Sequence, residues 1–247
     1  MNQDKRKLIG LILIIATILI AIGLGSYTVL HRNDHPKTIS VKGSAEQEIV
    51  SDLIVWNITI LTNSPTPLQG LREVERQRET VKRFLSRQEI PNESIEVGPV
   101  EYNERTNGYY DNQQQRYIEV HQGYDVQQTL TISSHDVDKV ELVSRNVGDL
   151  IELDVTARSN SPRYYYTKLA DLKLEMLAKA AEDARNRAKK IAKESNSSLG
   201  GLRKSNMGVF QILGKNSEED YSWGGTFNTS SKVKVINITV SSDFLVH

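Results

Sequence analysis

Two histidines near the start of the chain, His31 and His35, have a spacing that suits a pair of metal ligands. They stand beside Pro36 in a polar segment, and no H-E-x-x-H motif occurs anywhere in the sequence. A pair of surface histidines is the simpler interpretation. We therefore expect no metal site and no other cofactor.

Three carboxylates, Glu46, Glu48 and Asp52, are grouped closely enough to suggest acid–base chemistry. The sequence gives them no partner histidine and predicts no pocket around them. Asp52 interrupts an apolar strand, which is typical of a bulge or of an edge that opposes aggregation. The motifs of nucleophilic hydrolases, phosphate-binding loops and dinucleotide sites do not occur, and the chain has no cysteine. We expect a protein that is not an enzyme.

Aromatic side chains remain as candidates for a binding surface. Three pairs stand out in the sequence: Tyr109 and Tyr110, Tyr164 and Tyr165, and Tyr221 and Trp223. Tyrosine and tryptophan are enriched at protein interfaces, so we expect packing or subunit contacts here, with ligand contacts as the alternative. Nucleic acid is not expected as a partner, because 31 Lys and Arg residues are balanced by 31 Asp and Glu residues.

The segment most informative about location is Leu8–Leu30, which is apolar and carries no charge. At about 1.5 Å per residue, a helix of this length crosses a hydrocarbon core of ~30 Å. The segment is longer than the apolar region of a cleaved signal peptide and has only a weak cleavage motif at Gly23–Gly25. An uncleaved signal anchor is therefore favoured over a cleaved signal.

Orientation of this anchor follows from Lys5, Arg6 and Lys7, which precede it. By the positive-inside rule these charges favour a cytoplasmic N-terminus, residues 1–7, and a translocated C-terminal domain. Residues 31–37 are polar and predict a short linker, and residues 38–247 can bury one good core. We expect a single-pass protein of the bacterial inner membrane, with this domain in the periplasm or outside.

Patterning within residues 38–247 predicts an α+β fold. Apolar residues alternate in several segments, which predicts strands over 38–43, 46–63, 95–104, 117–133, 151–158, 207–212 and 232–241. Helices are expected after Thr66-Pro67, after Ser134 or Asp136, and over 166–195. A polar hairpin tip, residues 105–116, contains the turn-forming pair Asn107-Gly108. The mixed order of hairpins and helices indicates mainly antiparallel sheet with amphipathic helices packed on it, preceded by one transmembrane helix.

Two segments resemble the SIMPL-domain (DUF541) family of bacterial envelope proteins. The first is Ile39–Glu46, with the sequence ISVKGSAE, which leads into a long strand. The second is a late helix containing Ala180-Ala181, Asp183-Ala184, Ala188 and Ile191-Ala192, followed by Leu199-Gly200. The order and spacing of these motifs carry the resemblance, which covers roughly residues 38–245.

The resemblance implies a secreted or membrane-anchored α+β domain, frequently oligomeric, without an established catalytic activity or cofactor. This chain departs from the family pattern at Asn196-Ser197-Ser198, where a glycine usually ends the long helix. It also retains an anchor where many members have a segment that looks cleavable.

These observations lead to one expected function and one alternative. We expect a non-enzymatic, membrane-anchored envelope protein whose outer domain self-associates into a homo-oligomeric ring or cage, with a scaffold or stress-protective role. Other envelope proteins are possible partners. The alternative is a monomeric module that binds a ligand or an envelope polymer through its tyrosine-rich loops.

Overall fold

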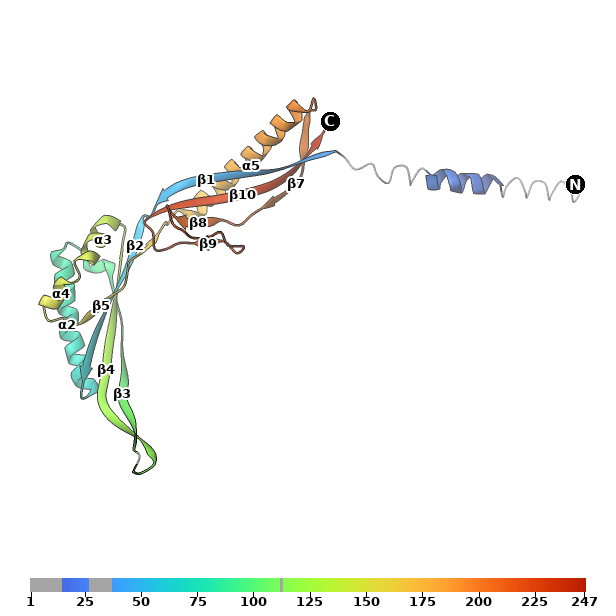
Figure 1. The fold of residues 1–247 in the computed structure, drawn as a ribbon. Helices are drawn as coiled ribbons and strands as arrows, with labels where there is room; N and C mark the ends of the chain where they lie inside the picture. The colour runs from blue at the N-terminus through green and yellow to red at the C-terminus, as the bar shows by residue number, and fades with distance from the viewer. Residues whose placement is uncertain (1–14, 27–36, 112) are drawn as a thin grey trace, which may run out of the picture. The chain divides into compact units, whose positions relative to one another are not determined.

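The computed structural model describes residues 15–26, 37–111 and 113–247 (Figure 1). Residues 15–26 form an exposed helix. The rest of the predicted anchor (8–14 and 27–30), the orienting residues Lys5–Lys7 and most of the predicted linker lie outside the described residues. Within those described ranges, no helix combines the length and apolar character needed to cross a membrane.

The chain divides into two compact units, which we describe separately. Unit 1 comprises Met1–Gly43, Ala181–Met207 and Val240–His247, and unit 2 comprises Ser44–Ala180 and Gly208–Thr239. Unit 1 is thus assembled from segments far apart in the sequence.

Two five-stranded sheets form the framework. In the first sheet the strand order is β1 (Thr38–Val50), β10 (Val233–Val246), β8 (Gln211–Gly214) and β9 (Thr226–Phe227), and β7 (Leu199–Met207) also pairs with β10. In the second sheet the order is β3 (Ile95–Asp111), β4 (Arg116–Ser134), β2 (Leu53–Ser64) and β5 (Ala157–Ser159), and β6 (Arg163–Tyr165) also pairs with β2. The strand pairs of the second sheet are antiparallel, whereas β8 and β9 are parallel.

Helices complete the fold between these strands. They are α2 (Pro67–Arg87), η1 (Asn92–Ser94), α3 (Val137–Arg145), α4 (Asp149–Glu152) and α5 (Leu169–Glu194). The antiparallel-rich sheets with packed helices confirm the predicted α+β class.

The core of unit 2 lies between the second sheet and helices α2 and α3. Alternate residues of β2, from Ile54 to Ile60, are fully buried on this side, as the period of two in the sequence predicts. Helix α2 begins where expected, because the Thr66 side chain accepts a hydrogen bond from Gln69 N and Pro67 follows at the first helical position.

The core of unit 1 is small and depends on close approach by α5. Ala184 and Ala188 are fully buried against Val41 and Phe244. Two residues after α5 ends at Glu194, Asn196 adopts φ +52° in the closing turn. Asparagine tolerates this left-handed conformation better than most residues, so it performs here the role that glycine performs in the family pattern.

Three local predictions are wrong. The predicted strand 207–212 does not form as one strand, because β7 ends at Met207, β8 begins at Gln211, and residues 208–210 belong to neither. Of the predicted strand 151–158, residues 151 and 152 belong to helix α4, and only residues 157 and 158 lie in a strand, β5. Val155 N bonds back to Leu150 O and Asp154 adopts φ +56°, which closes a turn that buries Leu150 and Val155. The Asn107-Gly108 pair does not make the hairpin turn. Both residues lie in β3 and pair with residues of β4, and the chain reverses between Asp111 and Arg116.

Candidate interaction surfaces

Four of the six predicted contact residues are exposed, and they lie in two places in unit 2. Tyr109 and Tyr110 are on β3, each 56% exposed. Tyr221 and Trp223 are in the loop between β8 and β9, and the Trp223 side chain is 100% exposed. The exposed residues among the six predicted contacts therefore belong to two aromatic surfaces of unit 2.

The other two predicted residues lie on β6 and are differently placed. Tyr164 is buried, and burial raises the pKa of its phenol, as do the charge and hydrogen bond of Glu141. Tyr165 is partly exposed, with its ring 6.5 Å from that of Phe227. Tyr164 therefore packs inside unit 2 and contributes no exposed surface.

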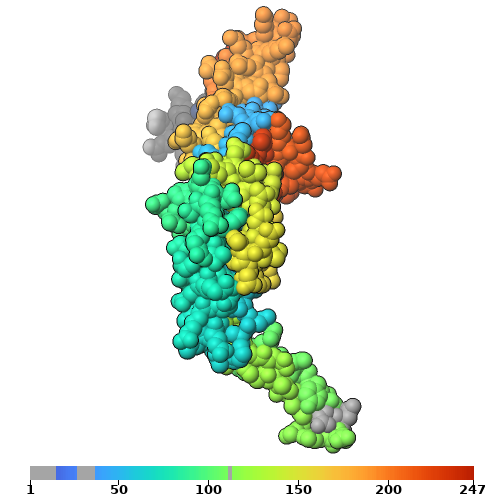
Figure 2. Space-filling view, turned by 90° about the vertical axis from the view of Figure 1, so that its left-hand side faces the viewer, coloured from blue at the N-terminus to red at the C-terminus, as the bar shows by residue number. Residues whose placement is uncertain are grey.

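The first exposed surface is the outer part of the β3–β4 hairpin, residues 105–123, which we call the arm. Strand β2 ends at Ser64, opposite Tyr124, so beyond this pair β4 has only β3 beside it among the described strands. Figure 1 shows the hairpin continuing beyond the N-terminal end of α2, and Figure 2 shows it as a narrow projection. A two-stranded ribbon of this kind is marginally stable by itself in water.

Both faces of the arm carry apolar side chains. Tyr110 lies directly opposite Tyr117 on one face, and Tyr109 lies opposite Ile118 on the other. The ring of Tyr117 also covers Gly108, where a side chain would collide with it. Each of the three tyrosines is more than half exposed. The arm thus presents aromatic surface in two directions.

The base of the arm is held by specific contacts. The pairing register shifts between Glu104 and Thr106, opposite Gly123, which has φ +103°. A Cβ atom at Gly123 would lie 2.6 Å from Ser64 O, so only glycine allows this close approach. His121 Nδ1 lies 2.7 Å from Glu104 Oε1. These contacts set the direction in which the arm leaves the sheet.

The second exposed surface is the loop of residues 215–225, which is ordered by buried polar side chains. The Gln211 amide donates to Ser222 O at 2.6 Å and accepts from Ser222 N at 3.3 Å. Asn228 donates to the Glu219 carboxylate at 2.6 Å, and Gly214 N donates to it at 3.1 Å. These hydrogen bonds hold the pKa of Glu219 below its usual value.

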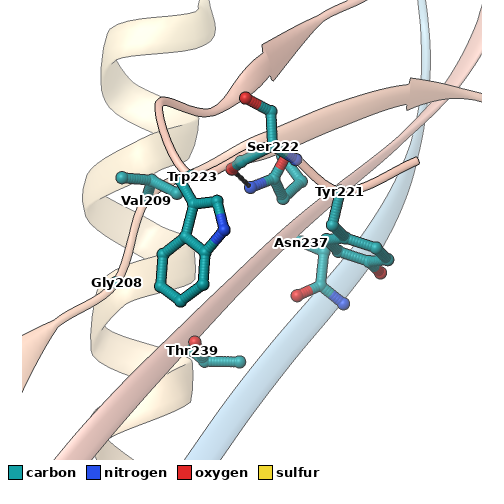
Figure 3. A pocket seen from close by; sticks show the side chains of 8 residues that line it. Gly208, Val209, Tyr221, Ser222, Trp223, Asn237 and Thr239 are labelled. Atoms are coloured by element: carbon teal, nitrogen blue, oxygen red, sulfur yellow. Dashed lines mark hydrogen bonds between the residues drawn. The ribbon is translucent and has the colours of Figure 1, made fainter. Parts of the chain in front are cut away.

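A groove of about 540 Å³ lies under this loop. It is lined by Gly208, Val209, Gln211, Tyr221, Ser222, Trp223, Asn237 and Thr239. Figure 3 shows Asn237 and Thr239 on strand β10, and Tyr221 and Trp223 reaching over from the loop. Burying one indole removes at least ~150 Å² from water, worth about 4 kcal/mol, so the exposed Trp223 is a strong candidate for contact with another molecule.

A buried lysine, Lys234, is the most unusual ionisable group of unit 2. Its side chain is 1% exposed, and its Nζ donates to Ser51 Oγ at 2.7 Å, to Tyr164 O at 3.0 Å and to Ser231 O. Burial lowers the pKa of Lys234 to about 8, although the charge of Glu219 acts in the opposite direction. All three proton positions are used by neutral oxygens. Lys234 therefore joins β10 to the segments that carry Ser51, Tyr164 and Ser231.

The pattern of β10 contains the signal for this burial. Lys234 is two residues from Ile236 and four from Ile238, which places it on their side of the strand. Both isoleucines are fully buried.

The three carboxylates considered for acid–base chemistry each have a separate partner. Glu46 accepts from Asn237 at 3.3 Å, and Glu48 pairs with Lys215 at 2.7 Å. Asp52 accepts from both the backbone N and the hydroxyl of Thr167 at 2.7 Å. Burial opposes ionisation of Asp52, but the Thr167 hydrogen bonds outweigh it and lower the pKa. Asp52 thus ties the β1–β2 junction to the segment before α5.

His31 and His35, the pair with a ligand-like spacing, lie outside the described residues. In the part of the chain that the structure describes, no three His, Cys, Asp or Glu side chains converge as a metal site would require.

Comparison with known proteins identifies the family. Residues 39–236 match the model of the SIMPL family, described as a protein of unknown function (DUF541). A search among curated proteins found no match. Because the family model covers most of the chain, the chain belongs to the SIMPL family.

Proposed function

We propose that this SIMPL-family chain is a non-enzymatic envelope protein that self-associates through its arm into a ring or cage. The observation that carries the proposal is the arm itself, a ribbon with both faces in solvent and three tyrosines more than half exposed. Isolated two-stranded ribbons gain stability when a partner covers them, and tyrosine is a favoured anchor at interfaces.

Charge distribution supports association between different surfaces of neighbouring copies. The described residues of unit 1 contain nine Lys and Arg and four Asp and Glu, whereas unit 2 contains 18 and 25. Unit 1 is therefore basic and unit 2 acidic, although the whole chain is neutral. Complementary charge steers partners together and suppresses contacts between like surfaces.

Contact between unlike surfaces has a consequence for the assembly. The arm itself is neutral, because Arg105 and Arg116 balance Asp111 and Glu119. The acidic remainder of unit 2 would steer the arm of one copy toward the basic unit 1 of the next. Such head-to-tail contacts generate a closed ring when the rotation between copies closes. Like surfaces meeting each other would instead produce a two-fold dimer.

The N-terminal sequence supports a location at a membrane. Leu8–Leu30 is apolar and uncharged, and Lys5–Lys7 precede it. We propose that this segment anchors the chain in the bacterial inner membrane with residues 38–247 outside the cytoplasm, where the assembly would act as a scaffold or stress-protective structure. Anchoring also raises the local concentration of copies, which favours self-association.

The test is sedimentation velocity of the full chain in detergent micelles, at about 50 mM and about 500 mM salt. Because the Debye length falls from roughly 14 Å to 4 Å over this range, we expect a defined oligomer at low salt that partly dissociates at high salt. A monomer at all protein concentrations and both salt concentrations would remove the proposal.

A further inference from the structure

We infer that the groove beside Trp223 binds an uncharged saccharide chain. This inference goes beyond the proposed self-association, because the groove lies at the loop of residues 215–225 and needs no second copy. It rests on four properties of the groove: an exposed aromatic platform, free polar groups on its floor, the lack of charged lining residues, and a loop that is ordered before any ligand binds.

The platform is the indole of Trp223. Its side chain is fully exposed while it lines the groove, so a ring face is open to a ligand. The face of an aromatic ring is electron-rich, and it attracts groups whose hydrogen atoms carry a partial positive charge. The C–H bonds on one side of a pyranose ring are such groups. Tyr221, which is 64% exposed, adds a second aromatic ring.

Free hydrogen-bonding groups line the floor. Asn237 donates through Nδ2 to Glu46, and its Oδ1 accepts no hydrogen bond within the part of the chain that the structure describes. Two residues further along β10, Thr239 presents an exposed side chain. Residues two apart on a strand are roughly 6.6 Å apart on the same face. This spacing suits hydroxyl groups on one sugar ring or on two linked rings.

The absence of charged side chains from the groove lining favours a neutral ligand. Residues lining the groove include none of Asp, Glu, Lys, Arg or His. A ligand with a carboxylate or phosphate would lose hydration here without gaining a cationic partner. Ligand sites of this type combine apolar surface with a small number of placed polar groups.

The loop is ordered by contacts that do not involve the ligand. Both atoms of the Gln211 amide are bonded to the backbone of Ser222, the residue before Trp223. Gly225 has φ +88°, and a Cβ there would lie 2.8 Å from Phe210 O. The backbone that carries the indole is therefore ordered before binding, which reduces the entropy cost of association.

A proline-rich peptide is the main competing occupant of an aromatic groove. Proline residues have no N–H group, so such a peptide offers few donors for Asn237 Oδ1. Sugar hydroxyls both donate and accept, and they satisfy Asn237 and Thr239 together. The unpaired acceptor on the floor thus favours a saccharide.

Tryptophan fluorescence of the full chain provides the test. The two tryptophans are Trp56, which is fully buried with its Nε1 bonded to Ser159, and Trp223, which is fully exposed. The probes are the neutral hexasaccharide of N-acetylglucosamine and maltohexaose. We expect at least one of them to shift the emission to shorter wavelength, because a sugar on Trp223 excludes water from the only exposed indole.

Variants of the groove residues show whether the fluorescence shift comes from sugar at Trp223. Calorimetric titration measures the binding affinity of each variant independently. We expect Trp223→Ala to weaken binding at least tenfold, Trp223→Phe to retain part of it, and Asn237→Ala to weaken it severalfold. Tyr102→Ala is the matched control, because Tyr102 is a 61% exposed aromatic on β3 outside both the arm and the groove, and it should bind like the wild type. Trp56 emission reports whether each variant remains folded.

Several results would overturn the inference. They are no response to either neutral probe, unchanged calorimetric binding by Trp223→Ala, equal or tighter binding of hexagalacturonate, and binding of a proline-rich peptide in place of the sugars. A blue shift that depends on protein concentration alone, without any response to sugar, would assign Trp223 to self-association instead.

Discussion

Replacing Lys234 with methionine is expected to lower the free energy of unfolding by about 2–3 kcal/mol at pH 7. Methionine fills much of the space of the lysine stem but donates no hydrogen bond. Ser51 Oγ, Tyr164 O and Ser231 O would then lose their shared donor, and a buried polar group without a partner costs about 1–3 kcal/mol. Removing the desolvated charge offsets part of this loss.

Stability should also depend on pH through Lys234. Its pKa is about 8 in the folded protein and 10.5 in the unfolded chain, so between these values the unfolded chain binds the proton more tightly. The free energy of unfolding therefore rises as pH rises through this window. Well below pH 8, Lys234 is charged in both states, so its unfavourable contribution to folding no longer changes with pH. From pH 7 to pH 9 the wild type should gain roughly 1 kcal/mol relative to Lys234→Met.

Urea unfolding of both proteins at the two pH values measures these differences. Lys168→Met is the matched control, because Lys168 is exposed, and its effect should stay within about 0.5 kcal/mol at both pH values. The structural role assigned to Lys234 would be contradicted if Lys234→Met were as stable as the wild type and the difference did not change with pH.

A second large effect is expected on the arm. Changing Tyr109, Tyr110 and Tyr117 together to serine should raise the dissociation constant for self-association on the order of 100-fold or more, since two or more aromatic anchors at about 2 kcal/mol each are lost. Stability of the monomer should change little, because these side chains are exposed. Sedimentation velocity over a range of protein concentrations measures the effect.

The control for the arm is Ile151→Ser, which removes a 75% exposed apolar side chain from helix α4 in the same unit. It should self-associate like the wild type. If the triple tyrosine variant formed the same oligomer at the same concentrations as the control, the arm would have no part in the interface.

Local patterns predicted much of the fold. The Thr66-Pro67 start of α2 and the alanine-rich face of α5 were readable because capping and helical periodicity depend on residues close in sequence. The strand prediction for 151–158 was wrong at its start. The alternation of apolar residues there is typical of a strand, but Leu150 and Val155 are buried from a turn instead. Asn107-Gly108 failed because the arm extends further, and Gly108 accommodates the ring of Tyr117.

Surfaces were harder to predict than elements. Tyr164 and Tyr165 are adjacent in sequence, yet Tyr164 packs into the hydrophobic core of unit 2 while Tyr165 stays partly exposed. The separation of charge was also hidden, because unit 1 combines three distant segments whose basic residues are balanced in the total composition. Such properties depend on which segments fold together.

Site-specific cross-linking from the arm tests self-association most directly. The chain has no cysteine, so Tyr110→Cys in the full chain carries a single photo-cross-linker, and Ile151→Cys carries the same reagent as a control. Two differently tagged copies are mixed in detergent micelles and irradiated. We predict a cross-linked pair containing both tags, formed from position 110 and not from 151, with the linked peptide in residues 181–207 of the other copy. Equal yields from both positions, or no cross-link between copies at position 110, would contradict the account.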